Sequence, residues 1–396
     1  MQPVPGRVTH IADTERRLGA AAVSRYVSAL SRTDPLADAF AADCTGPDCR
    51  QLMRLFEDLI EGRTTLAEHP DAPASLVDLI SQLRDEPPWL DREQIRRGQV
   101  AYSSHAKAAG IALGTASMVS GYDNAAASQP LIITGRFLTM ARLRTYETSM
   151  WVFAVARPGG LERSADGFAR TARVRMVHAF VRARIRSRGD WDVEALGAPI
   201  NQADLAYTVV EFSLLPIRAM QRVGVHFTDG EIADMYAMWR YMGYLMGVDD
   251  QILPADEAQS HLVEDLHVSL GPGPSDATRE YTAALLDGVF AVDVASADGA
   301  LGLIGRRWGR ELMHGLSRRF VGDPIADRLR IEDSVWQYSP GVVWPLNQVA
   351  SRIVRRFPRL QMWQVRRSLA EVQRLLDRSA ADLGISHDLV DHSPVS

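Results

Sequence analysis

The sequence predicts an all-α protein whose helices form one large single domain. Almost every segment repeats its apolar residues with a helical period, and no alternating run bounded by hairpin turns marks a strand. No long Gly/Ser-rich or charged linker divides the 396 residues, of which 46% are hydrophobic and 23% are charged. We therefore expect one large helical domain with extra helices at its N- and C-terminal ends.

The expected helices follow one another along the whole chain. The segment AAGIALGTASMVSGY (108–122) predicts a close-packed buried helix, since a membrane span needs roughly 20 apolar residues. Asp276 and Thr278 are expected to cap a helix start, and Gly384 to end the last helix. The other predicted helices are 17–31, 49–62, 75–85, 91–107, 132–156, 165–188, 201–222 with an interruption at Pro216, 230–248, 255–268, 275–294, 298–320, 341–356 and 359–383.

Charge and cysteine content narrow the classes of partner and compartment. The net charge of -5 and a pI of about 6.1 argue against a general binder of nucleic acid or anionic membranes, while a local basic patch stays compatible. Cys44 and Cys49 are too few for a disulfide framework or a structural zinc site, and the N-terminus has no apolar leader. We expect a cytoplasmic protein with no nucleic-acid partner and no membrane span.

The C-terminal segment 351–378 is basic and amphipathic, and Pro358 interrupts it. It either packs on the body with a solvated arginine face or contacts a partner helix or a second subunit. A homodimer is therefore one expectation.

The stretch RVRMVHAFVRARIRSR (173–188) places one histidine among apolar residues and arginines. At about 100° per residue, His178 lies at the edge of an apolar stripe. Arg175 and Arg182 lie just beyond His178 on the same side, three residues before it and four after it. Two interpretations stay open: a core histidine on a basic amphipathic helix, or a haem ligand whose neighbouring arginines bind the propionates. The stripe consists of Val174, Val177, Val181 and Ile185.

The stretch GRFLTMARLRTYETSMWVFAVAR (135–157) embeds charges in an apolar helix. Arg144, Glu147 and Thr148 fall at i, i+3 and i+4 and so share one face with apolar neighbours such as Trp151. Buried charges are costly unless they are paired. Either Arg144 and Glu147 form an ion pair that faces solvent, or they line a hydrophobic pocket. In the pocket, Glu147 is a candidate acid or base that Arg144 positions.

Two further patterns have both a structural and a functional interpretation. Asn201 with Asp204 is typical of a helix N-cap, and the alternative is that Gln202 or Asp204 donates or accepts hydrogen bonds around a haem. A methionine stripe is typical of core, and the alternative is the lining of a cofactor or substrate cavity. The methionines are Met235, Met238, Met242 and Met246.

Two Glu-x-x-His steps suggest a rival chemistry. Glu264 precedes His267, and Glu311 precedes His314, at the spacing that di-iron helical bundles use. A di-iron site also needs two further glutamates that face inward. Nothing in the sequence fixes the orientation of such glutamates.

Four stretches together resemble a known family. They are GRFLTMARLRTYETS, RVRMVHAFVR, GAPINQADLAYTVVEF and MWRYMGYLMGV, and they resemble the latex-clearing proteins, or rubber oxygenases, and the related MpaB-type oxygenases over about residues 88–250. The resemblance implies an all-α fold with a globin-like core around haem b. It divides the chain into an N-terminal helical extension (1–87), a haem-binding core (88–250) and a C-terminal extension packed on the core (251–396).

The resemblance also implies roles for individual residues. His178 is the proximal ligand of the haem iron, and Arg175 and Arg182 flank the haem edge. Arg144 and Thr148 lie on the distal side. Glu147 stands where the rubber-cleaving branch carries a lysine that can cap the iron, and a glutamate is a poorer resting ligand and a better proton shuttle.

The expected function follows from this resemblance and from the missing leader. A protein that stays inside the cell does not meet extracellular rubber, so we expect a small or medium-sized hydrophobic substrate with an alkene, such as a terpenoid, a polyketide or a prenylated intermediate. The expected enzyme is a haem b-dependent oxygenase that uses dioxygen. Cleavage of the double bond, epoxidation, hydroxylation and rearrangement stay open. The alternatives are a di-iron oxidase and a haem-binding protein without turnover.

Overall fold

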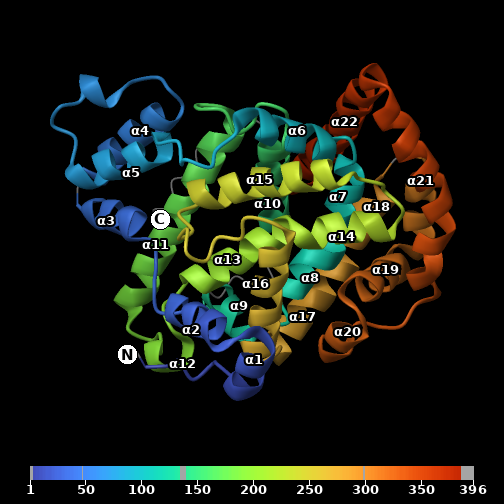
Figure 1. Ribbon diagram of the computed structural model, residues 1–396, viewed down its shortest axis with the longest axis horizontal. Coiled ribbons are helices and arrows are strands. Elements are labelled where there is room, and N and C mark those ends of the chain that lie inside the picture. The colour runs from blue at the N-terminus through green and yellow to red at the C-terminus, as the bar shows by residue number, and fades with distance from the viewer. Residues whose placement is uncertain (1–2, 47, 134–139, 298, 385–396) are drawn as a thin grey trace. The chain divides into compact units, whose positions relative to one another are not determined.

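The computed structural model describes residues 3–46, 48–133, 140–297 and 299–384. These residues form helices joined by short loops and contain no strand, so the predicted all-α class is confirmed (Figure 1). The first part of the predicted helix 132–156, residues 134–139, lies outside the described residues.

The chain forms two compact units, and each unit combines three segments of the sequence. Unit 1 comprises segments within 1–99, 154–209 and 236–271, and unit 2 comprises segments within 100–153, 210–235 and 272–396. The division of the chain at residues 88 and 250 stays a prediction, since compactness does not define a cofactor-binding core. The chain passes from one unit to the other within α6 (Arg92–Ser103), α10 (Ala141–Ala156), α13 (Gln202–Phe212) and α15 (Asp229–Leu245).

Unit 1 is built around the long helix α11 (Asp166–Arg188), against which α3 and α4 pack. Its early helices contribute a small apolar core in which the rings of Phe40 and Phe56 lie 5.8 Å apart. The other elements of unit 1 are α1 (Ile11–Leu18), α2 (Ala20–Ala29), α3 (Pro35–Asp43), α4 (Cys49–Ile60), η1 (Leu66–Glu68), α5 (Ala74–Arg84), α12 (Val193–Leu196) and α16 (Glu257–Leu270).

Unit 2 has its core between α19 (Gly299–Val321) and two π-helical turns, η2 (Leu113–Ser117) and η3 (Leu285–Phe290). Gly114 in η2 touches Phe290 in η3 so closely that an added Cβ would lie 3.0 Å from the ring. The other elements are α7 (Ala106–Ala112), α8 (Met118–Gly121), α9 (Ala125–Ile133), α14 (Leu214–Arg222), α17 (Asp276–Ala284), α18 (Ala291–Ala295), α20 (Asp323–Arg328), η4 (Val335–Tyr338), α21 (Ser339–Arg356) and α22 (Pro358–Leu383).

Some of the predicted helices are interrupted in the structure, at a glycine or before a proline. The prediction of one helix over 17–31 is wrong, because Gly19 has φ +89° and ends α1 before α2 begins. The interruption expected at Pro216 lies three residues earlier, at Ser213. Proline has no N–H for the carbonyl of Phe212 and its ring clashes with that carbonyl, so α13 ends there.

The predicted caps are largely confirmed. The helix expected near Asp276 begins with a capping box between Ser275 and Thr278, so the N-cap is Ser275 and Thr278 is its partner. Gly384 ends α22 with φ +68°. Asn201 accepts a hydrogen bond from the backbone N–H of Asp204 at 2.9 Å, as an N-cap does.

The four methionines of the predicted core stripe are all buried: Met235, Met238, Met242 and Met246.

Candidate functional site

Helix α11 in unit 1 carries His178 on a partly accessible apolar face. His178 is half-buried, as are Val174 and Val181, and Val177 is 44% exposed. Ile185, the last residue of the predicted stripe, is buried. The imidazole therefore stands beside apolar side chains that this chain covers only in part.

Arg175 is held by a buried carboxylate. Its Nε donates to Asp34 Oδ2 at 2.6 Å and its Nη2 to Asp34 Oδ1 at 3.0 Å. Its Nη1 donates to Gln82 Oε1 at 2.5 Å and to the carbonyl of Leu245 at 3.3 Å. The guanidinium thus ties α11 to three other segments of unit 1.

Among the described residues, Arg182 pairs with one carboxylate, and two of its nitrogens have no hydrogen-bond partner. Its Nε donates to Asp38 Oδ1 at 2.6 Å, and its side chain is only 1% exposed. Among the residues that the structure describes, no acceptor lies within hydrogen-bond distance of its buried Nη1 and Nη2. Buried guanidinium N–H groups are costly to leave unpaired, so this arrangement favours an acceptor other than the described residues.

The two acids come from the same short helix, α3. Asp34 is its N-cap, accepting a hydrogen bond from the backbone N–H of Ala37 at 3.3 Å, and Pro35 occupies the first helical position. Asp38 follows Asp34 by four residues, so both carboxylates lie on one face of α3. Sequence reasoning missed this pair, because the segment TDPLAD reads only as an ordinary helix start.

Helix α10 places the second predicted set of residues in unit 2. Arg144 and Thr148 are half-buried, whereas Glu147 is exposed. The buried face of α10 contains Thr145, and Glu147 lies about 160° away from it around the helix. Trp151, also on α10, packs edge-to-face on Phe212 with ring centroids 4.9 Å apart.

Two tyrosines near Arg144 were not identified from the sequence. The rings of Tyr122 and Tyr281 meet at 4.8 Å in an edge-to-face contact. Burial raises the pKa of Tyr122 well above its usual range, and the Arg144 guanidinium opposes that shift. Burial also raises the pKa of Tyr281, again against Arg144. Two neutral phenols therefore lie within electrostatic range of Arg144, and no spacing rule connects residues so far apart in sequence.

The predicted residues thus fall into two sets, one in each unit. His178, Arg175 and Arg182 lie on α11 within unit 1. Arg144, Glu147 and Thr148 lie on α10 within unit 2.

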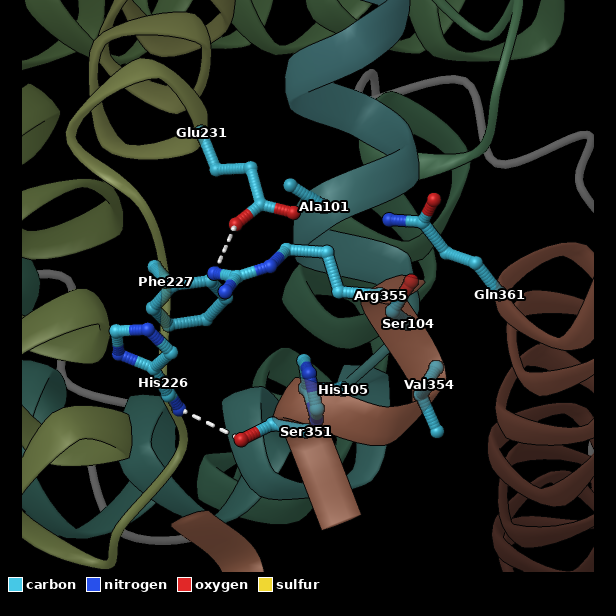
Figure 2. A pocket seen from close by; sticks show the side chains of 10 residues that line it. All are labelled: Ala101, Ser104, His105, His226, Phe227, Glu231, Ser351, Val354, Arg355 and Gln361. Carbon is cyan, nitrogen blue, oxygen red and sulfur yellow. Dashed lines mark hydrogen bonds and ion pairs between the residues drawn. The ribbon is translucent and has the colours of Figure 1, made fainter. Parts of the chain in front are cut away.

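A small pocket in unit 2 contains none of these residues. Figure 2 shows its lining, with His226, Glu231, Ser351 and Arg355 pointing into one small space. Its cavity volume of about 10 Å³ is enough for about one water molecule. The pocket is therefore a packing defect under α21 and too small for an organic substrate.

The Glu-x-x-His pairs do not form a metal site. His267 is buried in unit 1, where Tyr26 Oη lies 2.9 Å from its Nδ1, and His314 Nε2 lies 2.8 Å from Asp287 Oδ1 in unit 2. Within the described ranges, no three His, Cys, Asp or Glu side chains are grouped so that they could hold a metal ion. The di-iron alternative therefore has no ligand set in this part of the chain.

Comparison with known protein families gives a match over most of the chain. Residues 103–356 match the model of a family described as "ER-bound oxygenase mpaB/B'/Rubber oxygenase, catalytic domain". The chain belongs to this oxygenase family. It is therefore an enzyme, an oxygenase, and the alternative of a haem-binding protein without turnover is wrong.

A solved structure supports the same fold for this member of the rubber oxygenase/MpaB family. A structure titled "Structure of Latex Clearing Protein LCP in the closed state" superposes with a TM-score of 0.60 and 19% sequence identity. The match covers 87% of this chain and 88% of that chain. A search of the curated proteins found no match. None of the described helices is both long and apolar enough to cross a membrane.

Proposed function

We propose that this oxygenase uses haem b, held through His178, to oxidise the alkene of a small or medium-sized hydrophobic substrate with dioxygen. The observation that carries the proposal is the buried Arg182 guanidinium, whose Nη1 and Nη2 have no acceptor among the described residues. Arg182 follows His178 by one helical turn. A haem propionate is a carboxylate that such a guanidinium binds through two parallel hydrogen bonds.

The surroundings of His178 also fit a haem. A haem held by His178 would need apolar side chains around it, and Val174, Val177 and Val181 would supply them, since they are not fully buried. Arg175 has a different role in this proposal. Because Asp34, Gln82 and Leu245 already accept its hydrogen bonds, Arg175 fixes the position of α11 and so the direction of the imidazole.

In the proposed chemistry the cofactor and the protein side chains have different roles. Haem supplies the binding and activation of dioxygen. His178 would hold the iron, and Arg182 would bind a propionate. The Arg144 guanidinium and the Thr148 hydroxyl orient oxygen-bearing groups of the reactants by hydrogen bonding. Glu147 is exposed, and its carboxylate is the candidate acid or base of this proposal.

The substrate class rests on this family membership and on the apolar surroundings of the proposed site. A terpenoid, a polyketide or a prenylated intermediate would present an alkene in an apolar skeleton. Oxygen uptake with a panel of such alkenes, followed by mass spectrometry, identifies the product class. Two carbonyl fragments indicate cleavage, and a single product with one added oxygen atom indicates epoxidation or hydroxylation.

The visible spectrum of the full chain tests haem ligation directly. Purified protein supplied with haem is expected to show a Soret band, and His178→Ala is expected to lose at least 90% of the retained haem, that is about tenfold, because the axial bond is gone. His261→Ala is the matched control, since this histidine is exposed and lies on α16. A chain that takes up no haem, or equal haem retention in the two variants, would contradict the proposal.

A further inference from the structure

Helix α21 exposes an unusually apolar face. Val342 and Leu346 are 76% and 74% exposed, and Val349 and Ile353 are 58% and 49% exposed. At about 100° per residue these four side chains fall within an arc of about 60°. A contiguous exposed stripe of this kind marks an interaction surface on a folded protein. We call this set of four residues the α21 stripe.

Polar side chains on the opposite face of α21 bind the helix to unit 2. Asn347 Nδ2 donates to the carbonyl of Val223 at 2.7 Å, and Ser351 Oγ accepts from the backbone N–H of His226 at 3.0 Å. Arg355 pairs with Glu231 at 3.6 Å, and Figure 2 shows Ser351 and Arg355 turned toward the pocket. The helix therefore presents its apolar side outward because its polar side is bound.

Exposed aromatic side chains precede and follow the α21 stripe in the sequence. Tyr338 before the helix is 72% exposed. Phe357, between α21 and α22, is 57% exposed, and Trp363 on α22 is 51% exposed. Tyrosine and tryptophan favour the headgroup level of a bilayer, where one end of the ring meets water and the rest is apolar.

The sequence segment that contains the α21 stripe carries only positive charge. From 334 to 370 the sequence has no Asp or Glu, although the whole chain carries a net charge of -5. Arg352, Arg356 and Arg359 are exposed, and in the described part of the chain no carboxylate pairs with them. The arginines of this segment are Arg352, Arg355, Arg356, Arg359, Arg366 and Arg367.

This charge distribution favours a membrane over a second copy of the chain. A symmetric dimer through the α21 stripe would bring the same arginines together from both subunits, with no acidic residue in the segment to pair with them. An anionic bilayer surface offers phosphates for the arginines and an acyl boundary for the apolar side chains.

We propose that the α21 stripe, with Phe357 and Trp363, binds the interface of an anionic phospholipid membrane, with α21 parallel to the surface. The inference goes beyond the proposed haem chemistry and does not depend on it. It gives the enzyme access to hydrophobic molecules that partition into membranes.

Vesicle flotation with the full chain tests the proposal. The chain is expected to float with vesicles of phosphatidylcholine and phosphatidylglycerol in equal parts, and several-fold less with phosphatidylcholine alone. Adding NaCl from about 0.05 M to about 0.5 M is expected to weaken binding, because salt screens the arginines. The double variant Leu346→Glu/Val349→Glu is expected to lose about tenfold in partitioning. Arg356→Gln/Arg359→Gln is expected to lose the preference for the anionic vesicles.

Val193→Glu is the matched control, since Val193 is 59% exposed on α12 and Val349 is 58% exposed. Circular dichroism and thermal melts check that every variant folds like the parent. The proposal is overturned if the chain floats with neither vesicle, if it binds both compositions equally, or if Val193→Glu loses as much binding as the double variant. It is also overturned if light scattering finds a dimer that Val349→Glu dissociates while vesicle binding is absent.

Discussion

Arg175 and Arg182 lie two turns apart on α11 but differ in how fully their hydrogen bonds are satisfied. Asp34, Gln82 and Leu245 accept from Arg175, whereas within the described ranges Asp38 alone accepts from Arg182, through Nε. Because the pairing of Arg175 is internal to the protein, its loss should affect folding. Because two nitrogens of Arg182 lack an acceptor in the described residues, its loss should affect what the protein binds.

Replacing Arg175 by Met should destabilise the fold strongly. Asp34 and Arg175 are each 3% exposed, so the variant leaves a buried carboxylate without its counter-charge. We expect the free energy of unfolding to fall by about 3–5 kcal/mol, measured by urea denaturation.

Arg170→Met is the control for this change, because Arg170 pairs with the exposed Asp166 on the same helix and should cost less than about 1 kcal/mol. Adding Asp34→Asn to Arg175→Met should recover part of the loss, since asparagine still caps α3. A loss for Arg175→Met no larger than that of the control would refute a structural role for the pair.

How far the candidate site could be predicted depends on whether its partners are close in sequence. The spacing of Arg175, His178 and Arg182 is local, so a helical wheel places them on one side of α11. Their acidic partners Asp34 and Asp38 precede them by more than 140 residues. No periodicity connects such residues, because only tertiary packing brings them together. The roles of these residues toward haem stay predictions.

At the scale of elements, the N-terminal segment before α1 is fastened by one ion pair. Arg7 donates to both carboxylate oxygens of Asp204 on α13, at 2.8 and 2.9 Å. Burial alone would raise the pKa of Asp204, but the Arg7 guanidinium outweighs it and holds that pKa below its usual value. Backbone hydrogen bonds from Gly6 and Thr9 reach the carbonyls of Glu194 and Leu270.

Arg7→Met should release this segment. The variant leaves Asp204 largely buried without its cation, so we expect faster amide hydrogen exchange over residues 6–9 and at the start of α13. Exchange detected by mass spectrometry measures this. Arg16→Met is the control, since Arg16 is 77% exposed and pairs within its own helix. Unchanged protection over 6–9 in Arg7→Met would contradict the fastening role.

The elements themselves were predictable where the signal is local. The capping box at Ser275, the glycine stop at Gly384 and the cap at Asn201 follow from side chains a few residues apart. The π-turn η2 was not predictable, because the apolar run 108–122 fits an uninterrupted helix equally well. The break was predicted at Pro216 but lies at Ser213, because a proline affects the carbonyl four residues before it.

At the scale of the whole molecule, residues outside the family match form ion pairs with residues inside it. Residues 103–356 match the oxygenase family, yet Asp34, Asp38 and Arg7 come from the segment before it. These side chains hold α11 and α13 within unit 1. The N-terminal helices therefore contribute buried ion pairs to the family's own helices, and a chain shortened to the matched residues would expose unpaired charges.

Burial also controls how the stability of unit 1 depends on pH. His267 stacks on Tyr207 with ring centroids 3.7 Å apart, and burial lowers its pKa to about 3. In the unfolded chain a histidine takes up its proton near pH 6.5. Between about pH 6.5 and 3 the unfolded state binds more protons than the folded one, so the free energy of unfolding falls as the pH falls.

His267→Gln should flatten this dependence. Each histidine kept neutral by the fold contributes a slope of up to about 1.4 kcal/mol per pH unit, and the variant removes one of them. His105 in unit 2, whose pKa burial lowers to about 4, still contributes in the same direction. Asp293 opposes both, because burial raises its pKa to about 6. Urea denaturation at several pH values between 4 and 7 therefore has to compare the variant with the parent chain. Equal slopes in the two proteins would show that His267 is not held neutral in the folded state.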